Sequence, residues 1–121
     1  MVVYFVDSNV FFYAKIFDRV YGGACAGVLD KIERGELEAV TSTLVVVELA
    51  NALRRYGLGD EVRDVVDAVF SLDMRVFEVD SIDVRTAAGF FDEFRVSPYD
   101  CVHAAVMKLS LIHISEPTRP Y

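Results

Sequence analysis

The chain of 121 residues contains only two cysteines, Cys25 and Cys101, and no apolar run near the roughly 18 residues that a membrane-spanning helix needs. The cysteines form neither a close-spaced zinc pattern nor a disulfide framework, so we expect buried thiols in a reducing cytoplasm. The apolar residues 1–6 stop at Asp7 without a basic leader, which favours a buried strand over a signal peptide.

Basic residues are also scarce, with 12 Lys and Arg against 19 Asp and Glu and a net charge of −7. This balance excludes a nucleic-acid binder that relies on a basic surface, so contact with a polyanion requires bridging cations. Apolar residues make up 54% of the chain, which excludes a disordered protein. For so small a domain, this excess predicts an apolar surface that meets a partner.

Apolar and turn-forming segments alternate along the chain in a regular way. Strands are predicted at residues 2–6, 37–41 and 75–79, and helices at 10–17, 21–34, 44–56, 60–72, 81–94 and 98–109. The continuous apolar run 2–6 predicts a strand covered on both faces. Strands separated by helices predict an α/β fold, a three-layer α/β/α sandwich on a central parallel sheet.

The segment 110–121 differs from the rest because it holds two of the three prolines and matches no helix or strand beyond Ile114. It resembles a translated sequencing-adaptor peptide. We therefore expect a native domain over residues 1–109, a foreign tail over 110–121, and a natural chain that continues past Leu109 with one or more further strands. A native proline-rich tail is the alternative.

Asp7 directly follows the first predicted strand, at the edge where open parallel sheets form their working crevice. The structural alternative is that Asp7 only caps the next helix. Asn9 either orients the Asp7 carboxylate or is itself the cap. Either Ser42 or Thr43 is expected to cap the helix 44–56.

Glu48 lies in the apolar stretch Leu-Val-Val-Val-Glu48-Leu-Ala of a predicted helix. A carboxylate in such a stretch must be paired, protonated or metal-bound, because burying it alone is costly. Arg55 is the available ion-pair partner, since the positions three and four residues on are Asn51 and Ala52.

Asp100 falls in the first turn of the helix predicted after Ser97 and Pro98, where the helix dipole alone favours an acidic residue. Asp7, Glu48 and Asp100 all lie near helix starts, and the predicted fold can bring them to one edge. Converging carboxylates repel one another, and a hard divalent cation such as Mg²⁺ or Mn²⁺ relieves that repulsion.

Three segments resemble the PIN domain, and most closely its VapC-type ribonuclease toxins of bacteria and archaea. They are Val-Asp7-Ser-Asn9, the apolar helix with Glu48, and Pro-Tyr-Asp100-Cys-Val-His-Ala-Ala. The resemblance covers about residues 1–109. It implies that Asp7, Glu48 and Asp100 form an acidic active site, with Asn9 and Ser42 as supporting polar residues.

The resemblance also implies a metal-dependent endoribonuclease that cuts tRNA or rRNA in the cytoplasm, a homodimer, and a VapB-type antitoxin as partner. Asp7 and Asp100 are expected to bind Mg²⁺ or Mn²⁺ directly, and Glu48 to bind through water or position the nucleophile. The family usually has a further acidic residue after the next strand. Here a proline, Pro117, stands at that place and Glu116 is one position off, so we expect weak or no activity from this chain.

Several other side chains have two interpretations. His103 is a candidate general base or a packed histidine, and Tyr13 and Tyr99 are candidate base-stacking residues or part of the core. Arg54 and Arg55 are candidate RNA-backbone contacts or solvated surface residues.

Other enzyme classes fit less well. A haloacid-dehalogenase-type phosphatase needs a second aspartate where Asn9 stands, and a receiver domain needs an acidic pair where Asp7 is followed by Ser8. The main alternative is an inactive PIN-like module that binds RNA or protein, which metal binding would distinguish.

Overall fold

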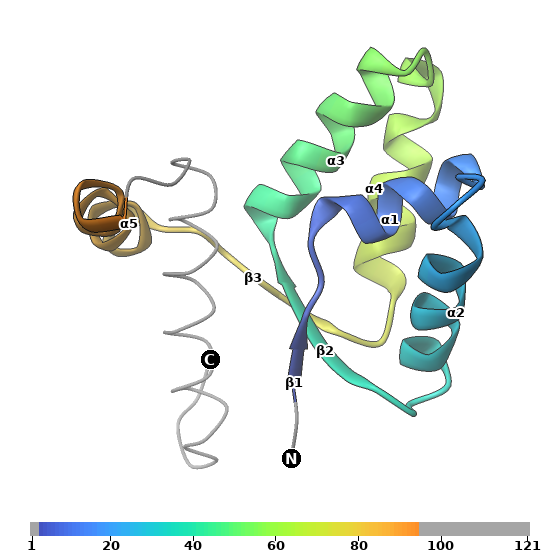
Figure 1. Ribbon diagram of the computed structural model, residues 1–121, viewed down its shortest axis with the longest axis horizontal. Helices are drawn as coiled ribbons and strands as arrows, with labels where there is room; N and C mark the ends of the chain where they lie inside the picture. The colour runs from blue at the N-terminus through green and yellow to red at the C-terminus, as the bar shows by residue number, and fades with distance from the viewer. Residues whose placement is uncertain (1–2, 95–121) are drawn as a thin grey trace. The chain divides into compact units, whose positions relative to one another are not determined.

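The computed structural model describes residues 3–94, with side chains for residues 3–89 (Figure 1). The described residues fall into two compact units that divide between Val76 and Phe77. The elements in chain order are β1 (Val3–Phe5), α1 (Ser8–Ile16), α2 (Gly22–Glu33), β2 (Glu38–Ser42), α3 (Thr43–Arg55), the short 3-10 helix η1 (Gly59–Glu61), α4 (Val62–Ser71), β3 (Arg75–Phe77) and α5 (Ser81–Phe94).

The predicted alternation of strands and helices is confirmed over this part of the chain, with boundaries shifted by at most two residues. The exception is the helix expected over residues 60–72, which is divided into η1 and α4. The helix predicted over residues 98–109, the boundary at Leu109 and the segment 110–121 lie outside the described residues.

The sheet is built on a parallel pair of strands. β1 pairs with β2, with Val3 opposite Glu38 and Phe5 opposite Val40, and the strand order is β1-β2-β3. Parallel neighbours need a long crossover connection, and α1 and α2 provide it here. The α/β class with a central parallel sheet is therefore confirmed.

Two glycines that follow helices have a left-handed backbone conformation. Gly35 follows α2 with φ +74° and Gly57 follows α3 with φ +91°. Only glycine adopts this left-handed conformation without a steric penalty, so both residues stop their helices and redirect the chain.

The hydrophobic core of the first unit is formed by α1, α2, β2, α3 and α4. Its buried apolar members are Val6, Phe11, Ile32, Ala39, Val45, Val46, Leu49, Leu53 and Val69. Burying each large aliphatic side chain contributes about 1.5–3 kcal/mol, which fixes α3 firmly against the sheet.

The expectation that residues 2–6 are covered on both faces is wrong at Tyr4. Val6 is buried, but Tyr4 keeps 50% of its surface exposed. An unbroken apolar run cannot distinguish a fully covered strand from one with an exposed aromatic residue. Among the described helices, none has both the length and the apolar character to span a bilayer.

Candidate functional site

The start of α1 is formed by Asp7. Its backbone is extended, with φ −88° and ψ 175°, and its carboxylate Oδ1 accepts hydrogen bonds from the backbone amides of Asn9 at 3.0 Å and Val10 at 3.4 Å. The capping interpretation of Asp7 is therefore confirmed. Asn9 contributes its backbone amide to this cap, while its side chain is exposed.

The second carboxylate oxygen of Asp7 is in a different situation. Asp7 is exposed, and Oδ2 makes no hydrogen bond or ion pair within residues 3–89. One oxygen is thus held in a fixed direction by the helix start while the other points to solvent. A carboxylate held in this way is preorganised to bind a cation.

In α3, the residue that caps the helix and the candidate acidic residue are different residues, Ser42 and Glu48. Ser42, which is fully buried, accepts a hydrogen bond at Oγ from the Val45 amide at 3.3 Å and caps the helix, with Thr43 as the first helical residue. Glu48 lies in the second turn and is half-buried, between the exposed Val47 and the fully buried Leu49.

The ion pair considered for Glu48 and Arg55 is not formed. Between described residues, the salt bridges join Lys15 to Glu61, and Arg34 to both Asp30 and Glu36. Arg55 lies exposed in the last turn of α3. An ion pair with Arg55 therefore does not account for the partly buried position of Glu48.

The two helix starts are brought together by the parallel strands. β1 leads into Asp7 and α1, and the neighbouring β2 leads into Ser42 and α3, so both helices begin at the same edge of the sheet (Figure 1). Two hydrogen bonds continue the pairing beyond β1. The Val6 amide donates to the Val40 carbonyl at 2.9 Å, and Thr41 Oγ1 donates to the Val6 carbonyl at 2.7 Å.

Cys25 in α2 lies within electrostatic range of this edge. Partial burial raises the pKa of its thiol, and the charges of Asp7 and then Asp18 raise it further. Cys25 is therefore a neutral thiol near Asp7 at pH 7. Sequence patterns gave no sign of this proximity, because it arises from the packing of α2 beside α1.

The other candidate residues are placed as follows. Asp100, His103 and Tyr99 lie outside the described residues. Tyr13 stacks on Tyr21 with ring centroids 5.5 Å apart and an angle of 30° between the rings. Arg54 is exposed in the last turn of α3.

The donor set fits a hard divalent cation. Asp7 has a carboxylate oxygen without a hydrogen bond from the described residues, and Glu48 lies in the second turn of the helix that begins at the same edge. Oxygen ligands of this kind suit Mg²⁺ and Mn²⁺. Over residues 3–89, no group of three or more His, Cys, Asp or Glu side chains is close enough to form a complete site. The described residues therefore do not form a complete metal site by themselves, and the assignment of Asp7 and Glu48 as metal ligands stays a prediction.

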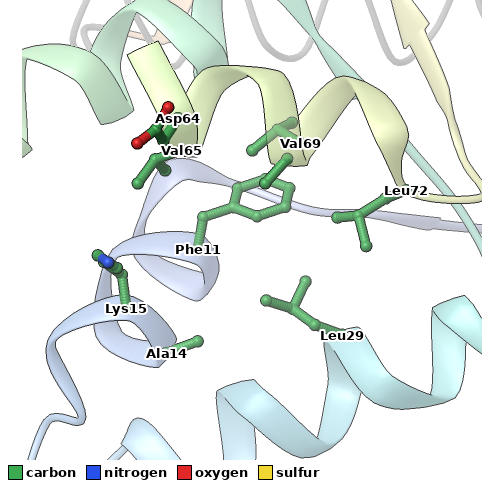
Figure 2. Close-up of a pocket in the computed structure, with 9 residues that line it drawn as sticks. Phe11, Ala14, Lys15, Leu29, Asp64, Val65, Val69 and Leu72 are labelled. Atoms are coloured by element: carbon green, nitrogen blue, oxygen red, sulfur yellow. The ribbon is translucent and has the colours of Figure 1, made fainter. Parts of the chain in front are cut away.

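A separate apolar cleft of about 380 Å³ lies between α1, α2 and α4. It is lined by Phe11, Ala14, Lys15, Leu29, Asp64, Val65, Ala68, Val69 and Leu72. Figure 2 shows Phe11 of α1 pointing toward Val65 and Val69 of α4, with Lys15 and Asp64 at one end. The Lys15 ammonium is paired with Glu61 at 2.7 Å. Lys15 and Asp64 are the charged residues of the lining, and the other lining residues are apolar.

Comparison with known proteins decides the family. The model of the PIN domain matches residues 4–114. The chain belongs to the PIN domain family. The resemblance found in the sequence is therefore confirmed, and Asp7 and Glu48 both fall within the matched region. A sequence search of curated proteins found no match.

Two solved structures share the fold. VapC20 of Mycobacterium tuberculosis, a sarcin-ricin loop cleaving toxin, is 19% identical with a TM-score of 0.73; the match covers 90% of this chain and 83% of VapC20. VapBC2 of Rickettsia felis, solved with a DNA fragment from its promoter, is 13% identical with a TM-score of 0.61. This match covers 86% of this chain and 79% of the VapBC2 chain. At these identities the likeness concerns the fold.

Proposed function

We propose that this PIN-domain protein is a VapC-type endoribonuclease that uses Mg²⁺ or Mn²⁺ to hydrolyse phosphodiester bonds in tRNA or rRNA in the cytoplasm. Asp7, Glu48 and Asp100 are the proposed metal ligands. The observation that carries the proposal is the meeting of two strand-to-helix junctions at one sheet edge, one ending in Asp7 and the other leading to Glu48.

The protein's own groups have separate tasks in this reaction. The amides of Asn9 and Val10 hold Asp7 Oδ1, which leaves Oδ2 directed outward as a ligand. Glu48, on a helix anchored by the buried Leu49, would hold the cation through water or would orient the attacking water. A bound divalent cation supplies an activated water and neutralises the phosphate charge.

The charge of the protein agrees with this assignment. A chain with a net charge of −7 repels RNA unless cations lie between its carboxylates and the phosphates. Arg54 and Arg55 at the end of α3 offer a local positive charge on the helix that carries Glu48. We propose that they contact the RNA backbone.

A cleavage assay tests the proposal. The full chain is incubated with tRNA and with rRNA fragments in Mg²⁺, in Mn²⁺ and in EDTA, together with Asp7→Asn and a matched control, Asp67→Asn, at an exposed site of α4. Because Pro117 stands at the place of the family's further acidic residue, we expect weak metal-dependent cleavage by the wild type and the control, and none by Asp7→Asn. Equal cleavage by Asp7→Asn, or cleavage in EDTA, would exclude this site as the catalytic centre.

An inactive PIN-like module that binds RNA or protein is the alternative. A ligand that binds only the folded state at a hundred times its Kd stabilises the protein by about 2.7 kcal/mol. A nuclease site should therefore raise the thermal midpoint in Mn²⁺. No cleavage together with no effect of Mn²⁺ would favour the module.

We further propose a VapB-type antitoxin as partner, docked on the apolar cleft of Figure 2, and a homodimer as the assembly. The VapBC2 neighbour and the apolar lining of the cleft support the antitoxin. In a co-elution experiment with a VapB-type antitoxin, Ala68→Arg should prevent the complex and Asp67→Asn should not. Unchanged co-elution of Ala68→Arg would exclude the cleft, and sedimentation equilibrium tests the dimer.

A further inference from the structure

We propose that Thr41 is a positioning residue that fixes Asp7 relative to the helix carrying Glu48; this inference rests on the proposed function of that site. Thr41 is fully buried at the end of β2, and its Oγ1 donates to the Val6 carbonyl at 2.7 Å. It has no exposed surface and touches no substrate. Its effect must therefore be transmitted through the backbone that it binds.

The hydrogen bond from Thr41 Oγ1 to the Val6 carbonyl replaces a backbone hydrogen bond that β2 does not make. The Val6 amide pairs with the Val40 carbonyl, but β2 ends at Ser42, which turns away to cap α3. A buried carbonyl without a donor is costly, and the Thr41 hydroxyl supplies that donor. The pairing of β1 with β2 thus extends one step further by means of a side chain.

Peptide geometry carries this restraint to Asp7. The Val6 carbonyl and the Asp7 nitrogen and Cα belong to one planar peptide group, so a bond to that oxygen fixes where the Asp7 side chain begins. The Asn9 and Val10 amides fix the other end by holding Oδ1. Asp7 is held from both sides, and Oδ2 has a defined direction.

The same residue connects this restraint to Glu48. Thr41 directly precedes Ser42, the cap of α3, so a single short segment binds β1 and starts the glutamate helix. Loss of the Thr41 hydroxyl would make the position of Asp7 relative to α3 less fixed, without removing the carboxylate of Asp7 or of Glu48. A purely structural hydroxyl would affect stability alone.

The test uses Thr41→Val, which removes the donor and keeps the shape, and Thr41→Ser, which keeps the donor. Thr86→Val is the matched control, because Thr86 Oγ1 also donates to a backbone carbonyl, that of Ile82 at 2.8 Å. The readouts are Mn²⁺ affinity by direct titration, kcat and KM for RNA cleavage, urea unfolding, and hydrogen exchange of the Asn9 and Val10 amides.

We expect Thr41→Val to weaken Mn²⁺ binding and lower kcat by about 10- to 100-fold with little change in KM. Thr41→Ser should remain within about twofold of the wild type, and the Asn9 and Val10 amides should exchange about fivefold faster in Thr41→Val alone. Reduced urea stability of Thr41→Val with unchanged Mn²⁺ affinity and amide exchange would overturn the inference.

The amide exchange also separates this inference from the proposed function. If the wild type binds no Mn²⁺ and cleaves no RNA, the proposed function fails. Faster exchange of Asn9 and Val10 in Thr41→Val then still supports the positioning of Asp7, whereas exchange equal to that of Thr86→Val rejects it.

Discussion

Among the described helices, α1 and α5 each start at an exposed aspartate that caps the helix with one carboxylate oxygen, and the surroundings of the two aspartates differ. At α1, Asp7 is exposed and uses only Oδ1 for the cap. At α5, Asp80 accepts from the Asp83 amide at 3.0 Å, and Asp83 accepts from the Asp80 amide at 3.0 Å. Asp83 is only 5% exposed.

The comparison shows that an acidic residue at a helix start has two uses. The Asp80 and Asp83 pair is a closed reciprocal cap that satisfies two backbone amides. Asp7 caps its helix with one oxygen and presents the other at a sheet edge that also leads to Glu48. Asp7 and Asp80 therefore cap in the same way; they differ because Asp80 is paired with the buried Asp83, whereas Asp7 lies at the sheet edge where α3 also begins.

The largest effect is expected from Asp7→Asn. Asparagine caps a helix about as well as aspartate, so the free energy of unfolding should change by less than about 0.5 kcal/mol, while RNA cleavage should fall by at least about 100-fold. Asp80→Asn is the matched change at α5 and should leave cleavage unaltered. Equal effects of the two variants on cleavage rates would remove the distinction between the two helix starts.

Glu48→Gln should reduce RNA cleavage by about 10- to 100-fold, because glutamine keeps the shape and loses the charge. Urea unfolding should stay close to that of the wild type, since Ser42 rather than Glu48 caps α3. A large loss of stability without loss of cleavage would assign Glu48 to the framework of α3.

Ser42→Ala should destabilise the protein by about 1 kcal/mol, because the Val45 amide loses its acceptor at a buried helix start. Urea unfolding measures this loss. A change below about 0.3 kcal/mol would show that the Ser42 side chain contributes little to the start of α3.

The smallest effect concerns pH at α5. Burial and the neighbouring Asp80 charge raise the pKa of Asp83 above its ordinary value of 3.8. The hydrogen bond from the Asp80 amide acts in the opposite direction and lowers this pKa, but its effect is smaller. Protonated Asp83 therefore stabilises the folded state. This stabilisation is complete at pH values below the pKa of Asp83 in the unfolded chain, and it is lost as the pH rises through the higher pKa of Asp83 in the folded protein. Relative to wild type, Asp83→Asn should therefore gain stability in urea titrations as the pH rises above the ordinary pKa of 3.8, and a constant difference would contradict the raised pKa.

Much of the fold was predictable from local chemistry. Asp7, Ser42 and Asp80 mark helix starts because their side chains accept backbone amides, and Gly35 and Gly57 mark helix ends because they adopt positive φ. These signals depend on neighbours along the chain, so the sequence contains them directly.

The arrangement of the site was predictable only in part. Parallel topology predicted that the helix starts meet, and the structure agrees for Asp7 and for the helix of Glu48. The bond from Thr41 to Val6 and the nearness of Cys25 to Asp7 depend on register and helix packing across 18 or more residues. No local pattern encodes such contacts, and the placement of Asp100 remains a prediction.

The most direct test of the central claim is a calorimetric titration of the full chain with Mn²⁺. We expect saturable binding by the wild type and by Asp80→Asn, and its loss in Asp7→Asn and Glu48→Gln. Undiminished binding by Asp7→Asn, or no binding by the wild type, would contradict a metal centre at the shared start of α1 and α3.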